Sequence, residues 1–233
     1  MIALTSISPN HKNDQAIAVK TWLDLGIGVV SFNNKEECKL LSSKYQDVLF
    51  IETKNTLEKI YKRPHVAINV LFDYIKKHKE DEPFVIINSD IELSLTKEQL
   101  KAIEDKLKDG FICANRINYN NNKINGSRYE AGLDVFFLTQ EHILVYCSTS
   151  FALGQCHFDY WLPFRQINHN KKVYLIDNPI AYHQEHAVQY NADMWKLTGA
   201  HFAELENMQG RDIGRMSTDV FKYIYKHMER ITI

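Results

Sequence analysis

The stretch FVIINSDIEL, residues 84–93, joins an apolar run to acidic side chains. Asp90 and Glu92 lie two positions apart, so on a continuing strand both would project from one face. Carboxylate oxygens in such a place suit Mg²⁺ or Mn²⁺, which commonly bind one or two carboxylates together with phosphate oxygens of a substrate. Ser89 and Asp90 are also common turn formers, so a purely structural turn is the alternative interpretation.

The elements that must position these carboxylates alternate along the first half of the chain. The patterns predict strands and helices, in chain order, over residues 2–8, 12–26, 28–33, 35–45 and 48–53. A further helix is expected from Pro64 onward, and Thr96 with Gln99 forms a capping-box pattern ahead of another. The alternation predicts an α/β fold with a mostly parallel central sheet flanked by helices. Ligands of such sheets bind beyond the carboxyl ends of the strands, where Asp90 would lie.

Composition narrows the class of protein. The chain has 233 residues, of which 45% are hydrophobic and 24% charged, as expected for a globular domain. Its net charge of -1 gives no long-range attraction to nucleic acid or to an anionic membrane, and nucleic acid is not expected as a partner. No stretch approaches the ~20 apolar residues of a transmembrane segment, and no basic segment precedes a long apolar run at the amino terminus. With four scattered cysteines and no CxxC spacing, a cytoplasmic location is expected.

The order of strands and motifs resembles that of GT-A type glycosyltransferases, family 2-like members of the nucleotide-diphospho-sugar transferase superfamily. In that family a strand such as LTSIS, residues 4–8, opens the nucleotide-binding half, and the fourth strand runs into a short acidic DxD motif. NSDI, residues 88–91, looks like that motif with Asn88 in place of its first carboxylate. The resemblance implies that Asp90 holds a metal ion and that Asn88 and Ser89 contact the substrate.

The segment AYHQEH, residues 181–186, is similar to one whose first histidine completes the metal shell in some GT-A enzymes. The match implies that His183, with His186 next in line, joins Asp90 in holding Mn²⁺ or Mg²⁺. Imidazole suits Mn²⁺ better than Mg²⁺. A surface or hydrogen-bonded core histidine is the alternative interpretation.

CHFDYWLPF, residues 156–164, is similar to the segment where these enzymes carry an ED pair that faces the acceptor. Phe158 replaces the Glu, and Asp159 keeps the Asp. The resemblance implies an inverting transfer in which Asp159 takes the proton of the acceptor hydroxyl as its oxygen attacks the anomeric carbon. An acid favoured by the helix dipole is the alternative. Trp161 is the candidate for stacking on a sugar, with a place in the core as its alternative.

Further polar residues are candidates for binding the nucleotide. KRPHVAINVLFDYI, residues 62–75, resembles the family segment in which an Arg and an Asn approach the nucleotide, which implies such roles for Arg63 and Asn69. An arginine suits a diphosphate because its planar fork donates two hydrogen bonds at once. The polar residues at the first three strand ends complete the expected rim: Thr5, Ser6, Ser8, Asn33 and Glu52. Ordinary loop and surface roles are the alternative.

These patterns together predict one GT-A-like domain over residues 1–233. Residues 1–95 would form the nucleotide-binding half, residues 96–190 the acceptor and metal half, and residues 191–233 the C-terminal helices. The expected activity is transfer of a sugar from a UDP-linked nucleoside-diphosphate donor to a hydroxyl of a glycan or other acceptor. The alternatives are a nucleotidyltransferase, although no glycine-rich loop follows the first strand, and a non-catalytic sugar- or nucleotide-binding module.

Overall fold

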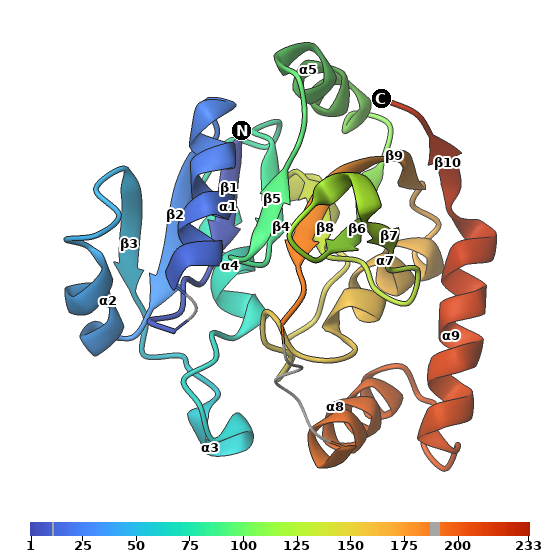
Figure 1. Cartoon of the computed structure of the whole chain (residues 1–233). Coiled ribbons are helices and arrows are strands. Elements are labelled where there is room, and N and C mark those ends of the chain that lie inside the picture. The colour runs from blue at the N-terminus through green and yellow to red at the C-terminus, as the bar shows by residue number, and fades with distance from the viewer. Residues whose placement is uncertain (11, 187–191) are drawn as a thin grey trace.

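A computed structural model describes residues 1–10, 12–186 and 192–233, and shows a mixed β-sheet covered by helices on both faces (Figure 1). The domain boundary expected at residue 190 falls outside the described residues. The elements in chain order are β1 (Ile2–Thr5), α1 (Lys12–Asp24), β2 (Gly28–Asn33), α2 (Lys35–Leu41), β3 (Val48–Glu52), α3 (Glu58–Tyr61), α4 (Ile68–Ile75), β4 (Phe84–Ile87), β5 (Ile91–Leu93), α5 (Lys97–Lys106), β6 (Phe111–Tyr119), η1 (Lys123–Asn125), β7 (Ser127–Arg128), β8 (Val135–Leu138), α6 (Gln140–Ile143), α7 (Phe158–Asn168), β9 (Val173–Gln184), α8 (Ala192–Leu205), α9 (Ile213–His227) and β10 (Glu229–Ile231).

The strand order explains where a site can form. The main path of the sheet runs β10-β9-β6-β8-β4-β1-β2-β3, and neighbours on it are parallel except at β8, which is antiparallel to both β6 and β4. The start of β8 therefore lies at the same edge as the carboxyl ends of β4 and β6. The expectation of an α/β fold with a mostly parallel sheet is confirmed.

Alternating residues of the strands build two hydrophobic layers, as the two-residue period of a strand requires. Ala3, Val29 and Val85 pack in a cluster that contains Trp22 of α1 and Ile103 of α5. Their chain neighbours, which include Leu4 and Ile86, pack on the opposite face with residues of α4, α7 and α9. Both faces of the strands are buried in this way, and the sheet is a rigid base for the side chains at its edge.

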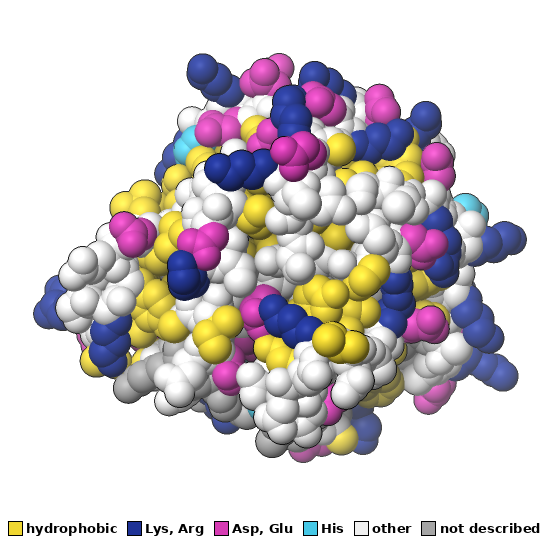
Figure 2. All heavy atoms as spheres, turned by 45° about the horizontal axis from the view of Figure 1, so that its top comes forward, with side chains coloured by type: hydrophobic (Ala, Val, Ile, Leu, Met, Phe, Trp, Pro, Cys, Tyr) yellow, Lys and Arg dark blue, Asp and Glu magenta, His cyan; other side chains and the backbone are white. Residues whose placement is uncertain are grey.

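The helix predicted from Pro64 begins only at Ile68. The residues before it are extended, because Val66 forms a bridge with Thr56 and Ala67 forms one with Ala152. Thr96 and Gln99 do form the predicted capping box at the start of α5. In the described parts of the chain, no helix combines the length and the apolar character needed to cross a membrane. On the face drawn in Figure 2, basic and acidic side chains are interspersed. Ion pairs of neighbouring residues include Lys101–Asp105 within α5 and Lys106–Asp109 at its end.

The run FVIINSDIEL forms two strands and not one. β4 ends at Ile87, a turn covers residues 88–90, and β5 begins at Ile91. β4 pairs with β1 and β8, whereas β5 leaves that part of the sheet and pairs with β9. Asp90 therefore lies at the point where the chain changes pairing partners.

Candidate active site

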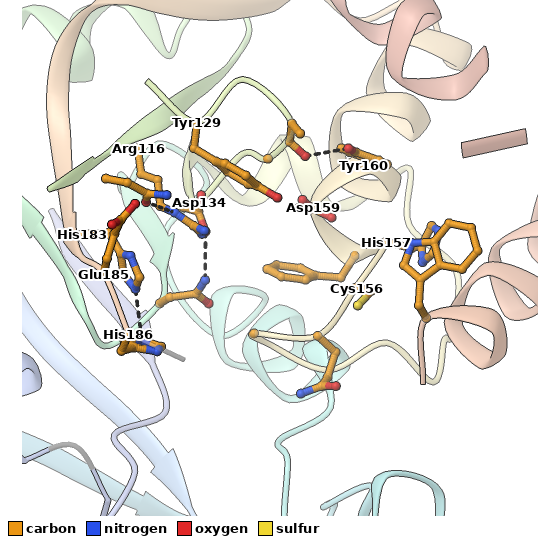
Figure 3. Close-up of a pocket in the computed structure, with 18 residues that line it drawn as sticks. Arg116, Tyr129, Asp134, Cys156, His157, Asp159, Tyr160, His183, Glu185 and His186 are labelled. Carbon is orange, nitrogen blue, oxygen red and sulfur yellow. Dashed lines mark hydrogen bonds and ion pairs between the residues drawn. The ribbon is translucent and has the colours of Figure 1, made fainter. Parts of the chain in front are cut away.

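A pocket of about 540 Å³ lies at the edge of the sheet where β4 and β6 end and β8 begins (Figure 3). The carboxyl end of β9, the loop before α7, the start of α7 and Trp195 of α8 complete its walls. Its size falls within the range of about 300–1,000 Å³ that is usual for small-molecule sites. The pocket is thus placed where ligands of α/β sheets bind.

Three potential metal ligands converge beside this pocket. β5 pairs with β9 so that Ile91 lies opposite His183, and this register brings Asp90 against the end of β9. Oδ2 of Asp90 lies 3.5 Å from Nε2 of His183 and 3.2 Å from Nε2 of His186. The two Nε2 atoms are 3.1 Å apart. Figure 3 shows both imidazoles at one end of the pocket.

The donor set and its spacing fit a divalent cation. An ion with bonds of about 2.1 Å holds neighbouring ligand atoms about 3.0–3.4 Å apart, close to the three distances above. Burial alone would raise the pKa of Asp90, but its hydrogen bonds and charge interactions with His183 and His186 outweigh burial and hold that pKa well below its usual range. The carboxylate is therefore ionised and able to act as a ligand at neutral pH. Two imidazoles beside one carboxylate favour a softer ion than Mg²⁺.

Glu92, the second acidic residue of the segment FVIINSDIEL, makes contacts of a different kind. Its side chain is 8% exposed; Oε2 pairs with Nζ of Lys123 at 2.5 Å, and Oε1 accepts a hydrogen bond from the hydroxyl of Tyr119. Lys123 also lies over the rings of Tyr119 and Tyr182. These contacts tie β5 to the end of β6 and to η1, so Glu92 supports the strand that directly follows Asp90.

A polar network lines the centre of the pocket. Asp134, directly before β8, pairs with Arg116 of β6 at 2.8 Å and accepts a hydrogen bond from Nδ2 of Asn88 at 3.2 Å. Nε of Arg116 donates to Oδ1 of Asn118, and the guanidinium lies 4.4 Å from the centroid of the Tyr129 ring. Burial raises the pKa of Asp134, while Arg116 opposes that shift. The pairing register of β6 with β9 shifts between Ala114 and Arg116, an irregularity of the kind that re-aims side chains at functional sites.

Asp159 stands in the first turn of α7 and lines the same pocket. Burial raises its pKa to about 7, and the nearby charge of Asp134 adds to that shift, although backbone N–H groups at the start of the helix oppose it. A Cβ placed on Gly132 would lie 2.8 Å from Cε1 of Tyr129, so the glycine lets the Tyr129 ring pack closely against this part of the pocket wall. A carboxyl group with such a pKa can exchange a proton near neutral pH.

His157 fixes the start of α7. Its backbone is left-handed, with φ 66, and its buried ring contacts both C-terminal helices. Nδ1 lies 2.9 Å from Oγ1 of Thr198 on α8, and Nε2 lies 2.9 Å from Oγ of Ser217 on α9. The Ser217 hydroxyl also donates to the carbonyl of Ile213, and the Thr198 hydroxyl to the carbonyl of Met194. Burial lowers the pKa of His157 to about 4, so the ring is neutral at pH 7.

No protein-family model matches the chain, and no curated protein matches it in sequence. Solved structures match it in fold. The mannosyltransferase PcManGT from Pyrobaculum calidifontis, in complex with GDP-Man and Mn²⁺, is 10% identical with a TM-score of 0.54, over 96% of this chain and 69% of that one. This chain has a nucleotide-sugar transferase-like fold.

Two further solved structures match at lower TM-scores. The 4-diphosphocytidyl-2C-methyl-D-erythritol synthase from Anaerococcus prevotii is 10% identical with a TM-score of 0.48, over 83% of this chain and 91% of that one. HddC from Yersinia pseudotuberculosis is 11% identical with a TM-score of 0.40, over 79% and 88%. At these identities the likeness concerns the fold, and a role for any residue must come from the site itself.

The structure brings together five of the residues singled out in the sequence, one of which is His186, on the pocket wall and in contact with Asp90. Asn88, Asp159 and His183 line the pocket, and Asp90 joins them through its contact with His183. Trp161 is fully buried, its indole N–H donates to Glu206, and its ring packs on Tyr146 and Phe151. The ring of Trp161 is therefore part of the hydrophobic core, which corrects the expectation that it stacks on a sugar.

The residues expected to bind the nucleotide do not line this pocket, and among them Thr5, Asn33 and Glu52 end β1, β2 and β3. Several of them serve the protein itself: Asn33 bonds to Ile7, Ser31 and Glu37; Asn69 to Thr149; Ser8 and Ser89 to Gln15. Glu52 and Arg63 are exposed, Ser6 is half-buried, and Thr5 is fully buried. Their nucleotide-binding roles stay predictions.

Sequence reasoning missed the central network of Arg116, Asp134 and Tyr129. A signal was present, because Asp134 interrupts the apolar run AGLDVFFLT and Arg116 interrupts FICANRINY. A charged residue within a buried strand needs a partner, and each of these two supplies it for the other.

Proposed function

We propose that the protein is a metal-dependent glycosyltransferase of the GT-A type. It transfers a sugar from a nucleoside-diphosphate donor, UDP-linked, to a hydroxyl of a glycan or other acceptor, with inversion. The observation that carries the proposal is the arrangement of two kinds of carboxylate around one pocket: Asp90 with two imidazoles at one end, and Asp159 with a raised pKa on another wall. The shared fold with a mannosyltransferase is consistent with it.

Asp159 serves as the general base in this proposal. With a pKa of about 7, its carboxylate takes the proton of the acceptor hydroxyl while that oxygen attacks the anomeric carbon. The bond from the anomeric carbon to the diphosphate oxygen breaks in the same step, and the sugar is inverted. The start of α7, held by His157, orients the carboxylate.

Asp90, His183 and His186 would hold the cation, and we propose Mn²⁺ because nitrogen ligands predominate. A bound cation supplies electrostatic stabilisation to the departing nucleoside diphosphate. The proposal assigns to the nucleotide Arg63, Asn69 of α4, Ser89 of the turn after β4, and Thr5, Ser6, Ser8, Asn33 and Glu52 at or after the ends of β1, β2 and β3, so that residues 1–95 would bind it.

A thermal-shift series with Mn²⁺ and either UDP, GDP, UDP-glucose or GDP-mannose tests the proposal. A ligand at 100 times its Kd stabilises the fold by about 2.7 kcal/mol, which for a chain of this size raises Tm by about 5–10 °C. The expected result is such a shift with one nucleotide, dependent on Mn²⁺, together with slow release of the free nucleoside diphosphate from its sugar nucleotide.

Two outcomes would assign another function. Consumption of a nucleoside triphosphate and a sugar phosphate with release of pyrophosphate would identify a nucleotidyltransferase. The chain lacks the glycine-rich loop such enzymes carry after the first strand, since SISPNHKND, residues 6–14, contains no glycine. Binding of sugar nucleotides without turnover and without dependence on the cation would identify a binding module.

A further inference from the structure

Two buried oxygen atoms at the centre of the pocket lack a hydrogen-bond partner in the described part of the chain. They are Oδ2 of Asp134 and Oδ1 of Asn88. The side chain of Asp134 is only 7% exposed, and its other oxygen, Oδ1, already accepts hydrogen bonds from Arg116 and Asn88. Buried acceptors in native proteins nearly always receive a donor, so these two atoms are positioned for a donor that comes with a ligand.

The hydrogen bonds around these atoms fix what the oxygens can do. Nδ2 of Asn88 donates to Oδ1 of Asp134, so the free atom of Asn88 is its carbonyl oxygen and a pure acceptor. Arg116 donates to the same Oδ1 at 2.8 Å, and this contact prevents the carboxylate from turning its other oxygen away. The two free acceptors are therefore held side by side on adjoining residues.

The charge balance at this point indicates the kind of ligand. Arg116 and Asp134 form an ion pair whose side chains are 22% and 7% exposed, so their charges largely cancel. A neutral group with hydrogen-bond donors fits two acceptors in such a place. Neighbouring hydroxyl groups of a sugar are groups of this kind.

Space for the ligand is provided by a glycine. Gly154 has φ +75, a backbone conformation that side chains disfavour, and a Cβ there would lie 3.7 Å from Oδ1 of Asn88. Gly154 therefore adds no side chain beside Asn88 on the wall of the pocket that both residues line.

We propose that Asp134 and Asn88 accept hydrogen bonds from two hydroxyl groups of the transferred sugar, and thereby select a fully hydroxylated sugar over its deoxy counterparts. This inference rests on the proposed function. A site whose buried acceptors are satisfied by substrate hydroxyls discriminates strongly against an analogue that lacks one, because the acceptor is then left unpaired.

The first test compares free nucleotides with sugar nucleotides by calorimetry in the presence of Mn²⁺. The probes are UDP with UDP-glucose and GDP with GDP-mannose, against the wild type and Asp134→Asn. The sugar nucleotide that binds should lose about 10- to 100-fold in affinity to Asp134→Asn, whereas its free nucleotide should change less than about 3-fold. Asp177→Asn, the same chemical change at an exposed pair with Arg230, is the matched control and should leave both affinities unchanged.

The second test needs no variant, so it holds even if Asp134→Asn does not fold. Analogues of the bound sugar nucleotide carry fluorine in place of one sugar hydroxyl at a time, since fluorine cannot donate a hydrogen bond. The wild type should bind two of the analogues about 10- to 100-fold more weakly than the parent. In Asp134→Asn, one of these two losses should disappear.

The outcomes separate this inference from the proposed function. If the nucleotides bind but every fluorinated analogue binds as tightly as its parent, or if Asp134→Asn weakens UDP or GDP as much as the sugar nucleotide, the inference is overturned and the proposed function stands. If neither UDP nor GDP binds with Mn²⁺, both are overturned.

Discussion

Asp90 and Asp159 are carboxylates of one site, and their surroundings drive their pKa values in opposite directions. Asp90 sits between two imidazoles that hold its pKa well below the usual range. Asp159 is partly buried at the start of α7, where burial and the nearby charge of Asp134 raise its pKa to about 7. The first environment suits a permanent anion and the second a group that exchanges protons. Such a divergence within one site assigns roles more firmly than either motif does alone.

The largest expected effect is on the base. Asp159→Asn removes the proton acceptor and should reduce kcat for sugar transfer by about 10²–10⁴-fold. In the wild type kcat should rise with pH and level off above a pKa of about 7, because only the ionised carboxylate accepts the proton. Stopped assays between pH 5 and 9 measure both, and the variant should lose this rising limb. A variant that keeps the limb would show that another group is the base.

The ligand carboxylate comes next. Asp90→Ala should reduce kcat by about 10²–10³-fold, the usual effect of removing one preorganised electrostatic group, and should also weaken binding of Mn²⁺ measured by calorimetry. Glu98→Gln, which changes an exposed carboxylate of α5, is the control. Turnover that survives in Asp90→Ala, with Mn²⁺ affinity intact, would remove Asp90 from the site.

Glu92 is a third carboxylate to compare with Asp90. It lies only two residues away in the sequence, but Tyr119 and Lys123 hold it in place of histidines. Glu92→Gln should change kcat by less than about 3-fold but lower Tm by about 3–10 °C, since it weakens the buried bonds to Tyr119 and Lys123. Differential scanning calorimetry and a rate assay below the transition measure the two effects. A loss of Mn²⁺ binding equal to that of Asp90→Ala would contradict the division of roles.

The smallest expected effect is on stability as a function of pH. The folded pKa of Asp159 lies above its unfolded value, so the folded state binds the proton more tightly and loses stability as pH rises from about 4 to about 7. Asp159→Asn lacks this loss. Its Tm relative to the wild type should therefore be higher by a few degrees at pH 8 and nearly equal at pH 4.5. An equal difference at both pH values would show that the buried charge is not its source.

Much of the fold follows from local pattern, because alternating apolar residues and capping pairs act over a few positions. Strand β2 and the capping box of Thr96 and Gln99 are formed as predicted. The start of α4 differs, since the bridges of Val66 and Ala67 to distant residues hold the chain extended past Pro64. Long-range pairing of this kind leaves no mark in the local sequence.

For the residues of the candidate site, too, local sequence predicts some features, and long-range pairing decides the others. Their spacing made Asp90 and Glu92 equal candidates, and only the pairing of β5 with β9 and the position of Lys123 distinguish the proposed metal ligand from a supporting residue. Trp161 was a candidate for stacking on a sugar because it is aromatic, but its ring packs against Tyr146 and Phe151. The link between Arg116 and Asp134 depends on the antiparallel placement of β8 beside β6, which the first-half alternation of strands and helices does not predict.

The contact between Asp90 and His186 spans 96 positions of the chain. Asp90 and the two histidines lie far apart in the sequence, so they meet only when the pairing of β5 with β9 closes a long loop. A cation bound by these three residues would stabilise only the fully folded state, because its ligands are together only in that state. The ion would then stabilise the folded protein in addition to its proposed role in the reaction.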